Sequence, residues 1–560
     1  MRTKKQWLSL LMITALLVLS ACSGNNTGSN AGTNNAPDKS ETDTGTANSG
    51  NTPGETGNLD PVKVDWYINL SWWKYSGEWG KDKFSQYVKE KFGLDLNFIT
   101  PATDDGQKLS AMVAANEIPD IVTVEGWKND QRFLIKPGLV QPMNDLIAKY
   151  TPEFKPYEDI FNWYKEPDGK TYGLPNYAYS KELIKEGEKL EPNTSFTLRK
   201  DIYDQIGRPD ISTPEQFIAA LEKVKNEVKS YDGKPLIPLQ LYDGIDSSAN
   251  WLSQYFSTPF EDKDGNWVDV RMHEKYYQGL KLLNEAYNKG LISKENFSET
   301  RDQINEKVAS GRVFSMFTAS QDFGNQMRTL YKADPKALYE TFVIKNYDGD
   351  KPYLQDLRGF GWLYTMVSKD TKYPDRIMKF LAFLNSKEGQ YMTAFGWEGE
   401  TYTKNASGQF EWTEAYDAAN KDGSAAAKWG IGFNLQQDWL TVKDLYAPSK
   451  NPEDVYINDM KKPLLEHSYD FNANNNRIDP ADPRWNQMNQ IKTQLELEWK
   501  KQLPQIIMAK TESDMKAKYD RAVAQMKKIG WDKWYAFQNE GFKKTKEILG
   551  YQVGWPGNAK

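Results

Sequence analysis

Cysteine and histidine are nearly absent from this chain of 560 residues, which has one Cys and two His. A single cysteine cannot form a disulfide framework, and so few histidines argue against a histidine-based catalytic centre or zinc site. A phosphate-binding loop of the GxxxxGKS or GxxxxGKT type is also missing, which disfavours a nucleotide-dependent enzyme. The charges nearly balance, with 71 basic and 77 acidic residues, and give no footprint for nucleic acid.

Large apolar side chains are missing from residues 23–58, where no Val, Ile, Leu, Met, Phe, Trp or Tyr occurs. Ser, Thr, Gly and Asn dominate instead. Such a segment cannot bury a core, so we expect it to be disordered. As a flexible coil it would span roughly 30–35 Å on average.

The first residues are typical of a secretory signal. Arg2, Lys4 and Lys5 give a positive start, and the nearly all-apolar stretch 8–19 is too short for a comfortable transmembrane helix. It ends in Leu19-Ser20-Ala21-Cys22, which resembles the bacterial lipobox and places the only cysteine at the lipidation position. Two acyl chains on Cys22 would give a stable anchor. Residues 1–21 are therefore predicted to be a signal peptide, and residues 22–58 a lipidated cysteine with a tether.

From residue 59 onward roughly 500 residues remain, which predicts two lobes or more. Apolar periodicity predicts a strand at 62–68, a helix at 84–92, a strand at 94–98, a helix at 109–113 and a strand at 121–124. This order indicates a parallel sheet wound by helices. Ligands bind such sheets beyond the carboxyl ends of the strands, so loops 69–75 and 125–127 are candidate site loops.

A turn at Asp168-Gly169 is predicted to lie where the chain passes from one lobe to another. Gly accepts positive φ and Asp tolerates it, and the flanks 161–164 and 170–172 have strand-like composition, so we expect a hairpin. Gly173-Leu174-Pro175 then carries the chain onward in extended form.

Further elements follow along the chain. Thr213, Pro214 and Gln216 predict a helix start with a capping box. We expect a turn at 264–267, strands at 313–317 and 362–367, a helix from Pro374, and a helical C-terminal part in which Trp499, Trp531 and Trp534 pack between helices.

Five passages in this order resemble the bacterial extracellular solute-binding protein family 1, the sugar-binding proteins of ABC importers, in its long Gram-positive lipoprotein branch. They are the lipobox with its tether and residues 115–121, 168–175, 277–292 and 367–386; the tract 395–399 also fits. The resemblance covers most of 62–399, and the last third matches only as a generic helical region.

The resemblance implies an α/β fold of two lobes, like that of periplasmic binding proteins, with hinge crossings and a helical C-terminal region. Crossings are expected near 172–176, between 354 and 361, and after Gly399. Residues 59–172 and 357–395 would form lobe one, and residues 173–356 and 396–560 lobe two.

A sugar cleft combines aromatic walls with a few placed polar groups. Core packing is the alternative role of each tryptophan, since aromatic side chains dominate cores. The predicted aromatic residues are Trp72, Trp73, Trp127, Tyr177, Trp251, Trp362 and Trp397. The predicted polar partners are Asn69, Glu125, Asn176, Gln321, Arg358 and Glu398.

One Asn-rich stretch is a candidate calcium-binding site. Long relatives often carry a calcium loop before an Ile-Pro-Leu tract, but here Ile237-Pro238-Leu239 follows a stretch too short to wrap an ion. Residues 470–482 have oxygen ligands at alternate positions, as hard calcium prefers. They lack the loop Gly and a Glu at the twelfth position, so a polar turn without metal is the alternative. The candidate ligands are Asp470, Asn472, Asn474 and Asp479.

The resemblance implies a monomeric, lipid-anchored receptor on the extracellular face of the cell membrane. It would bind an oligosaccharide, need no cofactor, catalyse no reaction and deliver its cargo to ABC permease subunits. Two alternatives stay open. A secreted glycoside hydrolase would need two carboxylates about 5–10 Å apart, and no local motif points to such a pair. A surface adhesion or sensing protein would share the fold and the tether.

Overall fold

A computed structural model describes residues 59–560 with the exception of 104–105, 127–129, 243, 320–321, 451, 477–481 and 551–560. The predicted signal peptide, Cys22 and the tether lie outside the described residues, and so do Trp127, Gln321 and Asp479. Within the described ranges, none of the helices is long and apolar enough to span a membrane.

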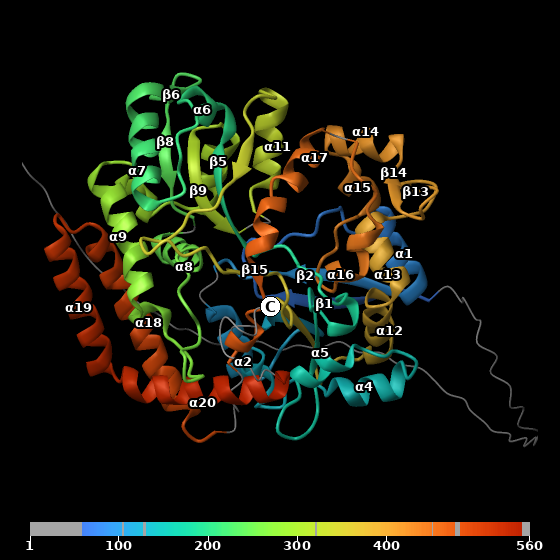
Figure 1. The fold of residues 1–560 in the computed structure, drawn as a ribbon. Helices are drawn as coiled ribbons and strands as arrows, with labels where there is room; N and C mark the ends of the chain where they lie inside the picture. Colours follow the sequence, from blue (N-terminus) through green and yellow to red (C-terminus); the bar gives the residue numbers. More distant parts are fainter. Residues whose placement is uncertain are drawn as a thin grey trace, which may run out of the picture. The chain divides into compact units, whose positions relative to one another are not determined.

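The first sheet has five strands in the order β2-β1-β3-β12-β4. Figure 1 labels its strands β1 and β2. As predicted, the first three strands of the chain run parallel, with β1 between its two partners. Strand β12 is antiparallel to both of its neighbours, so it begins at the edge where β3 ends. The strands are β1 (Val62–Ile68), β2 (Leu94–Ile99), β3 (Ile121–Glu125), β4 (Gly173–Pro175) and β12 (Leu363–Val367).

The helices that cover this sheet begin and end where the sequence indicates. Helix α1 (Lys83–Phe92) is capped by the Asp82 carboxylate and ends at Gly93, whose φ of 62° suits glycine. Its buried side chains join those of α12 (Pro374–Leu384) and of the sheet in one core. The other helices next to this sheet are α2 (Gln107–Ala115), α3 (Arg132–Ile135), α4 (Met143–Tyr150) and α5 (Glu158–Trp163).

The predicted hairpin around Asp168 is half correct. The tight turn is present, since Gly169 N donates to Glu166 O at 2.9 Å and Glu166 N donates to Lys170 O at 2.8 Å. Neither arm is a strand, however, because residues 161–163 belong to helix α5 and residues 170–172 are irregular and precede strand β4, which pairs with β12. Glu158 and Asp159 in the first turn favour the helix electrostatically, and Asn162 Nδ2 reaches Glu158 Oε1 one turn back at 3.4 Å. These local interactions outweigh the strand-like composition.

The second sheet has four strands in the order β10-β5-β9-β8. Strand β8 is parallel to β9, and the other neighbouring pairs are antiparallel. Thr194, at the start of β5, pairs with Ala319, at the end of β9. The carboxyl ends of β8 and β9 therefore lie at the edge where the chain enters this sheet. The strands are β5 (Thr194–Arg199), β8 (Ile237–Gln240), β9 (Val313–Ala319) and β10 (Tyr339–Thr341).

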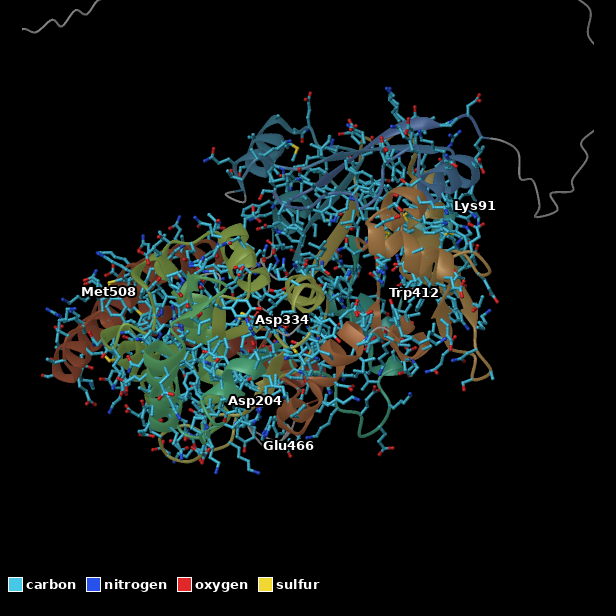
Figure 2. The ribbon with its side chains drawn as sticks, turned by 90° about the horizontal axis from the view of Figure 1, so that it is seen from above. Lys91, Asp204, Asp334, Trp412, Glu466 and Met508 are labelled. Atoms are coloured by element: carbon cyan, nitrogen blue, oxygen red, sulfur yellow. The ribbon has the colours of Figure 1, made fainter. Side chains whose placement is uncertain are left out.

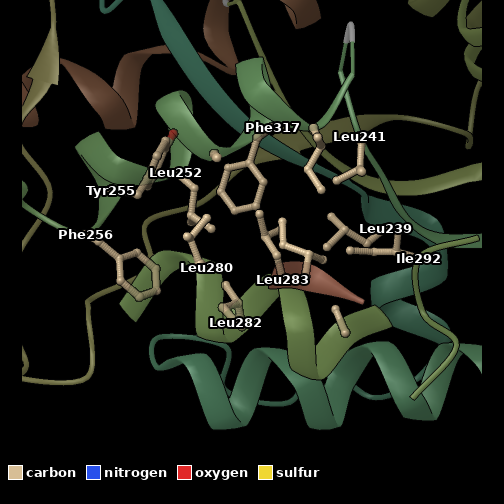
Figure 3. Close-up of a cluster of buried hydrophobic side chains, with 14 of the residues drawn as sticks. Leu239, Leu241, Leu252, Tyr255, Phe256, Leu280, Leu282, Leu283, Ile292 and Phe317 are labelled. Atoms are coloured by element: carbon tan, nitrogen blue, oxygen red, sulfur yellow. The ribbon is translucent and has the colours of Figure 1, made fainter. Parts of the chain in front are cut away.

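A large apolar core packs helices against the second sheet (Figure 3). Helix α7 (Pro214–Lys223) has the predicted capping box, in which Thr213 and Gln216 bond each other's backbone N–H. Leu252 and Tyr255 of α8 (Ile245–Tyr255) and Leu280 and Leu283 of α9 (Glu274–Asn288) point into the core beside Phe317 (Figure 3).

The C-terminal part is helical, as predicted. It consists of α18 (Trp485–Ile507), α19 (Glu512–Ile529) and α20 (Trp531–Leu549). Trp499 and Trp534 are buried in the core of the second sheet, and Trp531 packs against it. The expected helix-packing role of these tryptophans is confirmed.

Three connecting segments meet between the two sheets. Ala178 pairs with Phe360 and Pro192 with Asp356 in isolated bridges. Strand β11 (Leu354–Gln355) runs parallel to β15 (Ser468–Tyr469). The stretches 172–176 and 354–361, where crossings are expected, lie within or next to these segments.

The third crossing of the chain from one sheet to the other lies later in the sequence than expected. Phe433 and Leu435 belong to the core of the first sheet, together with Val64, whereas the family resemblance implies that residues 396–560 belong to the second lobe. Trp412, in the hairpin of β13 (Tyr402–Lys404) and β14 (Phe410–Trp412), lies beside the first sheet's helices (Figure 2). The chain reaches the second sheet's side at α17 (Pro452–Asp459), whose Ile457 packs with Val313. This passage lacks a local sequence signal.

The remaining α-helices and two further short strands complete the described part of the chain. They are α6 (Lys200–Gln205), β6 (Ser230–Tyr231), β7 (Lys234–Pro235), α10 (Arg301–Ala309), α11 (Gly324–Ala333), α13 (Lys387–Phe395), α14 (Glu414–Asp422), α15 (Ala425–Trp429) and α16 (Trp439–Val442).

Candidate functional site

Three of the predicted aromatic residues meet at the carboxyl-end edge of the first sheet. Trp72 follows β1 and is 59% exposed. Its ring lies nearly parallel to that of Trp362, with centroids 5.9 Å apart and planes 9° apart. The Tyr177 ring is 6.4 Å from Trp362 and tilted by 33°. Trp72, Tyr177 and Trp362 form what we call the aromatic platform.

Backbone hydrogen bonds hold the platform in place. Trp362 N donates to Asn176 O at 3.2 Å, and Trp362 O accepts from Gly126 N at 3.0 Å. The preceding Gly361 has φ of 116°, and a Cβ there would lie 2.5 Å from the Pro175 Cβ. Glycine is therefore required where the two segments cross.

Tyr177 is fixed by Gln437. Its N donates to Gln437 O at 2.7 Å, and its hydroxyl donates to Gln437 Oε1 at 3.1 Å. Burial raises the pKa of Tyr177 to about 12. The phenol is thus neutral at physiological pH and keeps its proton for donation. Sequence reasoning missed Gln437, because its segment carries no motif.

Asn176 has a structural role that differs from the predicted one. It is buried, its Oδ1 accepts from Leu363 N at 2.7 Å, and its Nδ2 donates to Asn434 O at 2.8 Å. The amide that was expected to pair with a ligand hydroxyl instead joins β12 to the segment around Asn434. Its neighbour in sequence, Tyr177, belongs to the platform.

Of the residues predicted at the ends of β1 and β3, one lies in the core and two lie at the edge of the sheet. Trp73 is 5% exposed, packs edge-on against Phe98 and donates from Nε1 to Asn434 Oδ1 at 3.2 Å, so it belongs to the core. Asn69 accepts at Oδ1 from the Tyr67 hydroxyl at 2.8 Å. Glu125 is the last residue of β3 and pairs with Leu363 of β12. Leu363 directly follows Trp362. Asn69 and Glu125 therefore lie at the same edge as the platform.

Trp397 and Glu398 are engaged elsewhere. The Lys83 ammonium lies 4.8 Å above the Trp397 ring, which packs against two apolar clusters. Glu398 is exposed and pairs with Lys404 at 2.6 Å on the surface hairpin. These contacts give Trp397 and Glu398 no part in the platform, in contrast to the sequence-based expectation.

Trp251 lies in α8, on the side of the second sheet. Its ring is partly buried against that sheet's core. Its indole N–H is buried and has no hydrogen-bond partner among the described residues. The other predicted ligand contacts, Trp127 and Gln321, lie outside the described residues.

Arg358 ties the connecting segments together. Its Nε donates to Asp356 Oδ2 at 2.6 Å, and its Nη1 lies 3.4 Å from Asp470 Oδ2. Burial raises the pKa of Asp356 to about 7, against the attraction of Arg358 and with a further contribution from the negative charge of Asp470. Arg358 therefore acts within the crossing region, where two carboxylates share its charge.

The edge of the second sheet carries a cluster that sequence reasoning missed. Arg301 Nη2 lies 2.8 Å from Asp322 Oδ2, and the Tyr242 hydroxyl donates to the same carboxylate oxygen. The Arg301 guanidinium also stacks 4.8 Å from the Tyr242 ring and 4.6 Å from that of Phe323. Tyr242 comes just after β8, and Asp322 and Phe323 come just after β9, so the rule about strand carboxyl ends could have found these three residues. Arg301 begins α10, which precedes β9, and that rule does not point to it.

The Asn-rich stretch offers a poor set of metal ligands in the part that the structure describes. Asp470 faces Arg358, and Asn474 Oδ1 accepts from Trp267 Nε1 at 2.9 Å. Asn472 Oδ1 accepts from Asn475 Nδ2 at 3.4 Å. Across the described ranges, no group of three or more His, Cys, Asp or Glu side chains is placed to hold a metal ion. A guanidinium beside Asp470 opposes a cation there.

A shallow hollow of about 540 Å³ lies at the carboxyl end of β2, lined by Thr100, Pro101, Ala102, Thr103, Gln107 and Lys108. Lys108 Nζ donates to Thr100 O at 3.1 Å beside it. The hollow shares its sheet edge with the platform.

Comparison with known proteins identifies the family. A profile described as bacterial extracellular solute-binding protein matches residues 83–407, more than half of the chain. The chain belongs to this family. The first sheet, the crossings and the platform all fall within or next to the matched range of this solute-binding protein.

Its relatives share the family at low identity. It is 25% identical over 240 residues to the fructooligosaccharide ABC transporter substrate-binding protein FusA of Streptococcus pneumoniae, a match that spans 40% of this chain and 44% of that protein. It is 21% identical to the polygalacturonan/rhamnogalacturonan-binding protein YtcQ of Bacillus subtilis, over 64% of this chain and 70% of that one.

Solved structures show the same fold. That of Streptococcus pneumoniae FusA in complex with kestose matches with a TM-score of 0.66 at 14% identity, over 87% of this chain and 100% of that one. An HMO-binding solute-binding protein of Bifidobacterium longum infantis matches with a TM-score of 0.64 at 14% identity, over 87% and 99% of the two chains. The predicted two-lobed α/β fold of this solute-binding protein is thereby confirmed.

Proposed function

We propose that this protein is a lipid-anchored extracellular receptor that binds an oligosaccharide between two lobes and delivers it to an ABC permease. The observation that carries the proposal is the exposed Trp72 stacked on Trp362 at the edge where α/β sheets bind ligands. Sugar rings present apolar C–H faces to such indoles, while their hydroxyls need neutral polar partners. Tyr177 and Gln437 provide such groups beside the platform.

The distribution of cores supports a division into lobes at revised boundaries. Residues 59–175 and 362–446 would form the first lobe, and residues 194–353 and 452–549 the second, with the connecting segments as hinge. A ligand touching both lobes would stabilise the closed form, and the permease would recognise closure. The relatives named above, which bind oligosaccharides or polysaccharides according to their names, support a sugar as cargo.

Anchoring by Cys22 would hold this receptor at the outer face of the membrane. The test is labelling of producing bacteria with a palmitate analogue, followed by fractionation. We expect label and membrane association in the native chain and neither in a Cys22→Ser variant. Membrane association of the variant without label would contradict the lipid anchor.

The cargo is tested by titration calorimetry of the full chain, purified in detergent, against a panel of neutral and acidic oligosaccharides. Product analysis accompanies each titration. Binding at micromolar concentration or below without cleavage is the expected result. Cleavage products would favour a glycoside hydrolase instead, and an absence of binding across the panel would contradict an oligosaccharide receptor.

A further inference from the structure

Asp322 lies at the edge of the second sheet with one of its two carboxylate oxygens engaged. Its Oδ2 accepts a hydrogen bond from the Tyr242 hydroxyl and lies 2.8 Å from Arg301 Nη2. Within the described ranges, Asp322 Oδ1 makes no hydrogen bond, and 24% of the side chain is exposed. A carboxylate held in this way offers its second oxygen as an acceptor for a ligand.

Two aromatic rings hold the guanidinium that pairs with Asp322. Arg301 lies 4.8 Å from the Tyr242 ring and 4.6 Å from that of Phe323, and the two rings contact each other edge-on at 5.9 Å. Phe323 has a φ of 61°, in the left-handed region that bulky side chains rarely adopt. Among the described aromatic residues, only Tyr177 of the platform also has a positive φ, at 46°. Strained backbone conformations cluster at binding sites, so the same feature marks the platform and this second cluster.

The platform and Asp322 border the same connecting segments. Tyr177 lies one residue before the first isolated bridge of these segments, and Thr194 lies two residues after the second. Thr194 pairs with Ala319, the last residue of β9, and Asp322 follows three residues later. The platform and Asp322 therefore stand at opposite ends of one connection, each at the carboxyl-end edge of its own sheet, where α/β sheets bind ligands.

We infer that Asp322 is the cargo contact of the second lobe, and that its Oδ1 accepts a hydrogen bond from a sugar hydroxyl. This inference rests on the proposed function and adds the group through which the second lobe holds the cargo. Because Arg301 balances the charge of Asp322, the pair as a whole is neutral and suits an uncharged hydroxyl. A hydrogen bond to an ionised acceptor is roughly twice as strong as one between neutral groups. Arg301 and Tyr242 are positioning residues that hold the carboxylate through Oδ2.

The two sides of the site then contribute differently to closure. Trp72 belongs to the first lobe and can stack on a sugar before the lobes close. A ligand shifts the protein toward the closed form only through contacts that it makes more strongly in that form. Loss of the acceptor at Asp322 should therefore reduce both affinity and contact with the second lobe, whereas loss of the Trp72 ring should reduce affinity and leave that contact in place at saturation.

The test uses the full chain and its Asp322→Asn and Trp72→Ala variants. The probes are kestose and the linear trimers of glucose, xylose, mannose and galacturonic acid. Titration calorimetry gives the Kd of each probe. Amide hydrogen exchange in β8 and α11, which flank Asp322, reports contact with the second lobe when the probe is saturating.

Glu340→Gln is the matched control in the same lobe. Glu340 pairs with Arg208 at 2.8 Å, 28% of its side chain is exposed, and Arg208 lies 4.7 Å from the Tyr203 ring. The pair thus resembles that of Asp322 and Arg301. Glu340 lies opposite Leu198, near the end of β5, whereas the edge that carries Asp322 adjoins the start of that strand.

Asp322→Asn is expected to raise the Kd of the tightest probe about tenfold, because the amide oxygen turns to Arg301 and Tyr242 and an NH₂ group replaces the acceptor. Saturating probe should slow exchange in β8 and α11 of the native chain and of Trp72→Ala, and should slow it much less in Asp322→Asn. Glu340→Gln should keep the native Kd within twofold.

If Asp322→Asn keeps the native Kd and the native slowing of exchange, the role of Asp322 is overturned while the receptor function stands. An equal loss of affinity in Glu340→Gln also overturns it. If the native chain binds none of the probes or of the wider oligosaccharide panel, the proposed function fails and this inference fails with it.

Discussion

The indole of Trp72 lies nearly parallel to that of Trp362, with centroids 5.9 Å apart, although the two residues belong to separate stretches of the chain. Trp72 follows β1, and Trp362 precedes β12, which pairs antiparallel with β3. The reversed direction of β12 is what brings its first residue to the carboxyl ends of the parallel strands. More than half of Trp72 is exposed, so its partner on the open side is a ligand in our interpretation.

Trp72→Ala should therefore weaken oligosaccharide binding without unfolding the protein. We expect the Kd to rise about tenfold to hundredfold, because truncating an aromatic anchor typically costs about 1.4–3 kcal/mol of binding. Calorimetry with the ligand found in the panel measures this change. The melting temperature should stay close to that of the native chain, since the side chain is exposed.

Trp412 offers a matched control. It also stacks on a neighbouring ring, that of Tyr416, with centroids 3.9 Å apart, but it belongs to the β13–β14 hairpin. Trp412→Ala should leave the Kd within twofold of the native value. An equal loss of affinity in both variants would show that the platform has no special part in binding.

Asn176→Ala should destabilise the fold, because one buried amide satisfies two distant backbone groups. Its loss leaves Leu363 N and Asn434 O without these partners in a dry environment. We expect the free energy of unfolding to fall by about 2–4 kcal/mol, measured by urea titration.

Asn97→Ala is the comparison for this variant, since Asn97 bonds Asp65 at 2.8 Å on the exposed face. It should change the free energy of unfolding by no more than about 0.5 kcal/mol. If Asn176→Ala changes the free energy of unfolding only slightly, the structural role of Asn176 is contradicted and its predicted role as a ligand contact is favoured.

The sequence predicted the elements with strong local signals and failed where partners lie far apart. Strands β1 to β3 and helices α1, α7 and α12 have clear periodicity or caps, and each is present. The rule about strand ends places Trp72 and Glu125 at the edge of the first sheet where the aromatic platform lies. It could not show that the Asn176 side chain would form hydrogen bonds with the backbone of Leu363 and Asn434, because these contacts depend on the whole fold.

Residue type was also a weak guide to exposure. Trp72 and Trp73 are adjacent and chemically equal, yet the first is exposed and the second buried beside Phe98. Trp397 was expected at the site and instead lies under Lys83. The chain crosses to the second sheet after Tyr446. No turn motif or change in composition marks this crossing in the sequence. The ligand-binding role of the platform residues stays a prediction.

Asp438 should make stability depend on pH between about 4 and 6. Burial raises its pKa to about 6, against hydrogen bonds from Thr441 and Leu440. The folded state therefore binds this proton more tightly than the unfolded state, so stability falls as pH rises from about 4 to 6 and levels off above that. Asp438→Asn keeps a cap for α16 and removes the titration.

Urea titrations from pH 4.5 to 8 measure the effect. The free energy of unfolding of Asp438→Asn, relative to the native chain, should rise with pH by about 2 kcal/mol, because the variant avoids burying a charge. The control is Asp444→Asn, since the hydrogen bond from Lys185 lowers the pKa of Asp444 and moves its titration below this window. If the free energies of unfolding of Asp438→Asn and of the native chain change with pH in parallel, the pH dependence does not come from Asp438.

Arg132 should favour the closed arrangement of the lobes, because it joins the body of the first sheet to the C-terminal helices. Its guanidinium lies 4.8 Å from the Trp485 ring. Arg132 begins α3, whose Leu134 is buried with the first sheet, while α18 contributes Leu495 to the core of the second. The contact is therefore outside the three connecting segments and would break when the lobes separate. A partly exposed contact between a guanidinium and an indole contributes about 0.5–1 kcal/mol.

Arg132→Ala should weaken ligand binding about twofold to fivefold, since closure then gains less free energy. Small-angle scattering of the ligand-free protein should show a larger radius of gyration than that of the native chain, and saturating ligand should remove most of the difference. Arg484→Ala is the matched control, because Arg484 lies over the Phe537 ring at 5.1 Å within the C-terminal helices themselves. It removes a similar contact without crossing between the lobes, so both readouts should stay native. An unchanged radius and affinity in Arg132→Ala would show that closure is controlled by the connecting segments and the ligand alone.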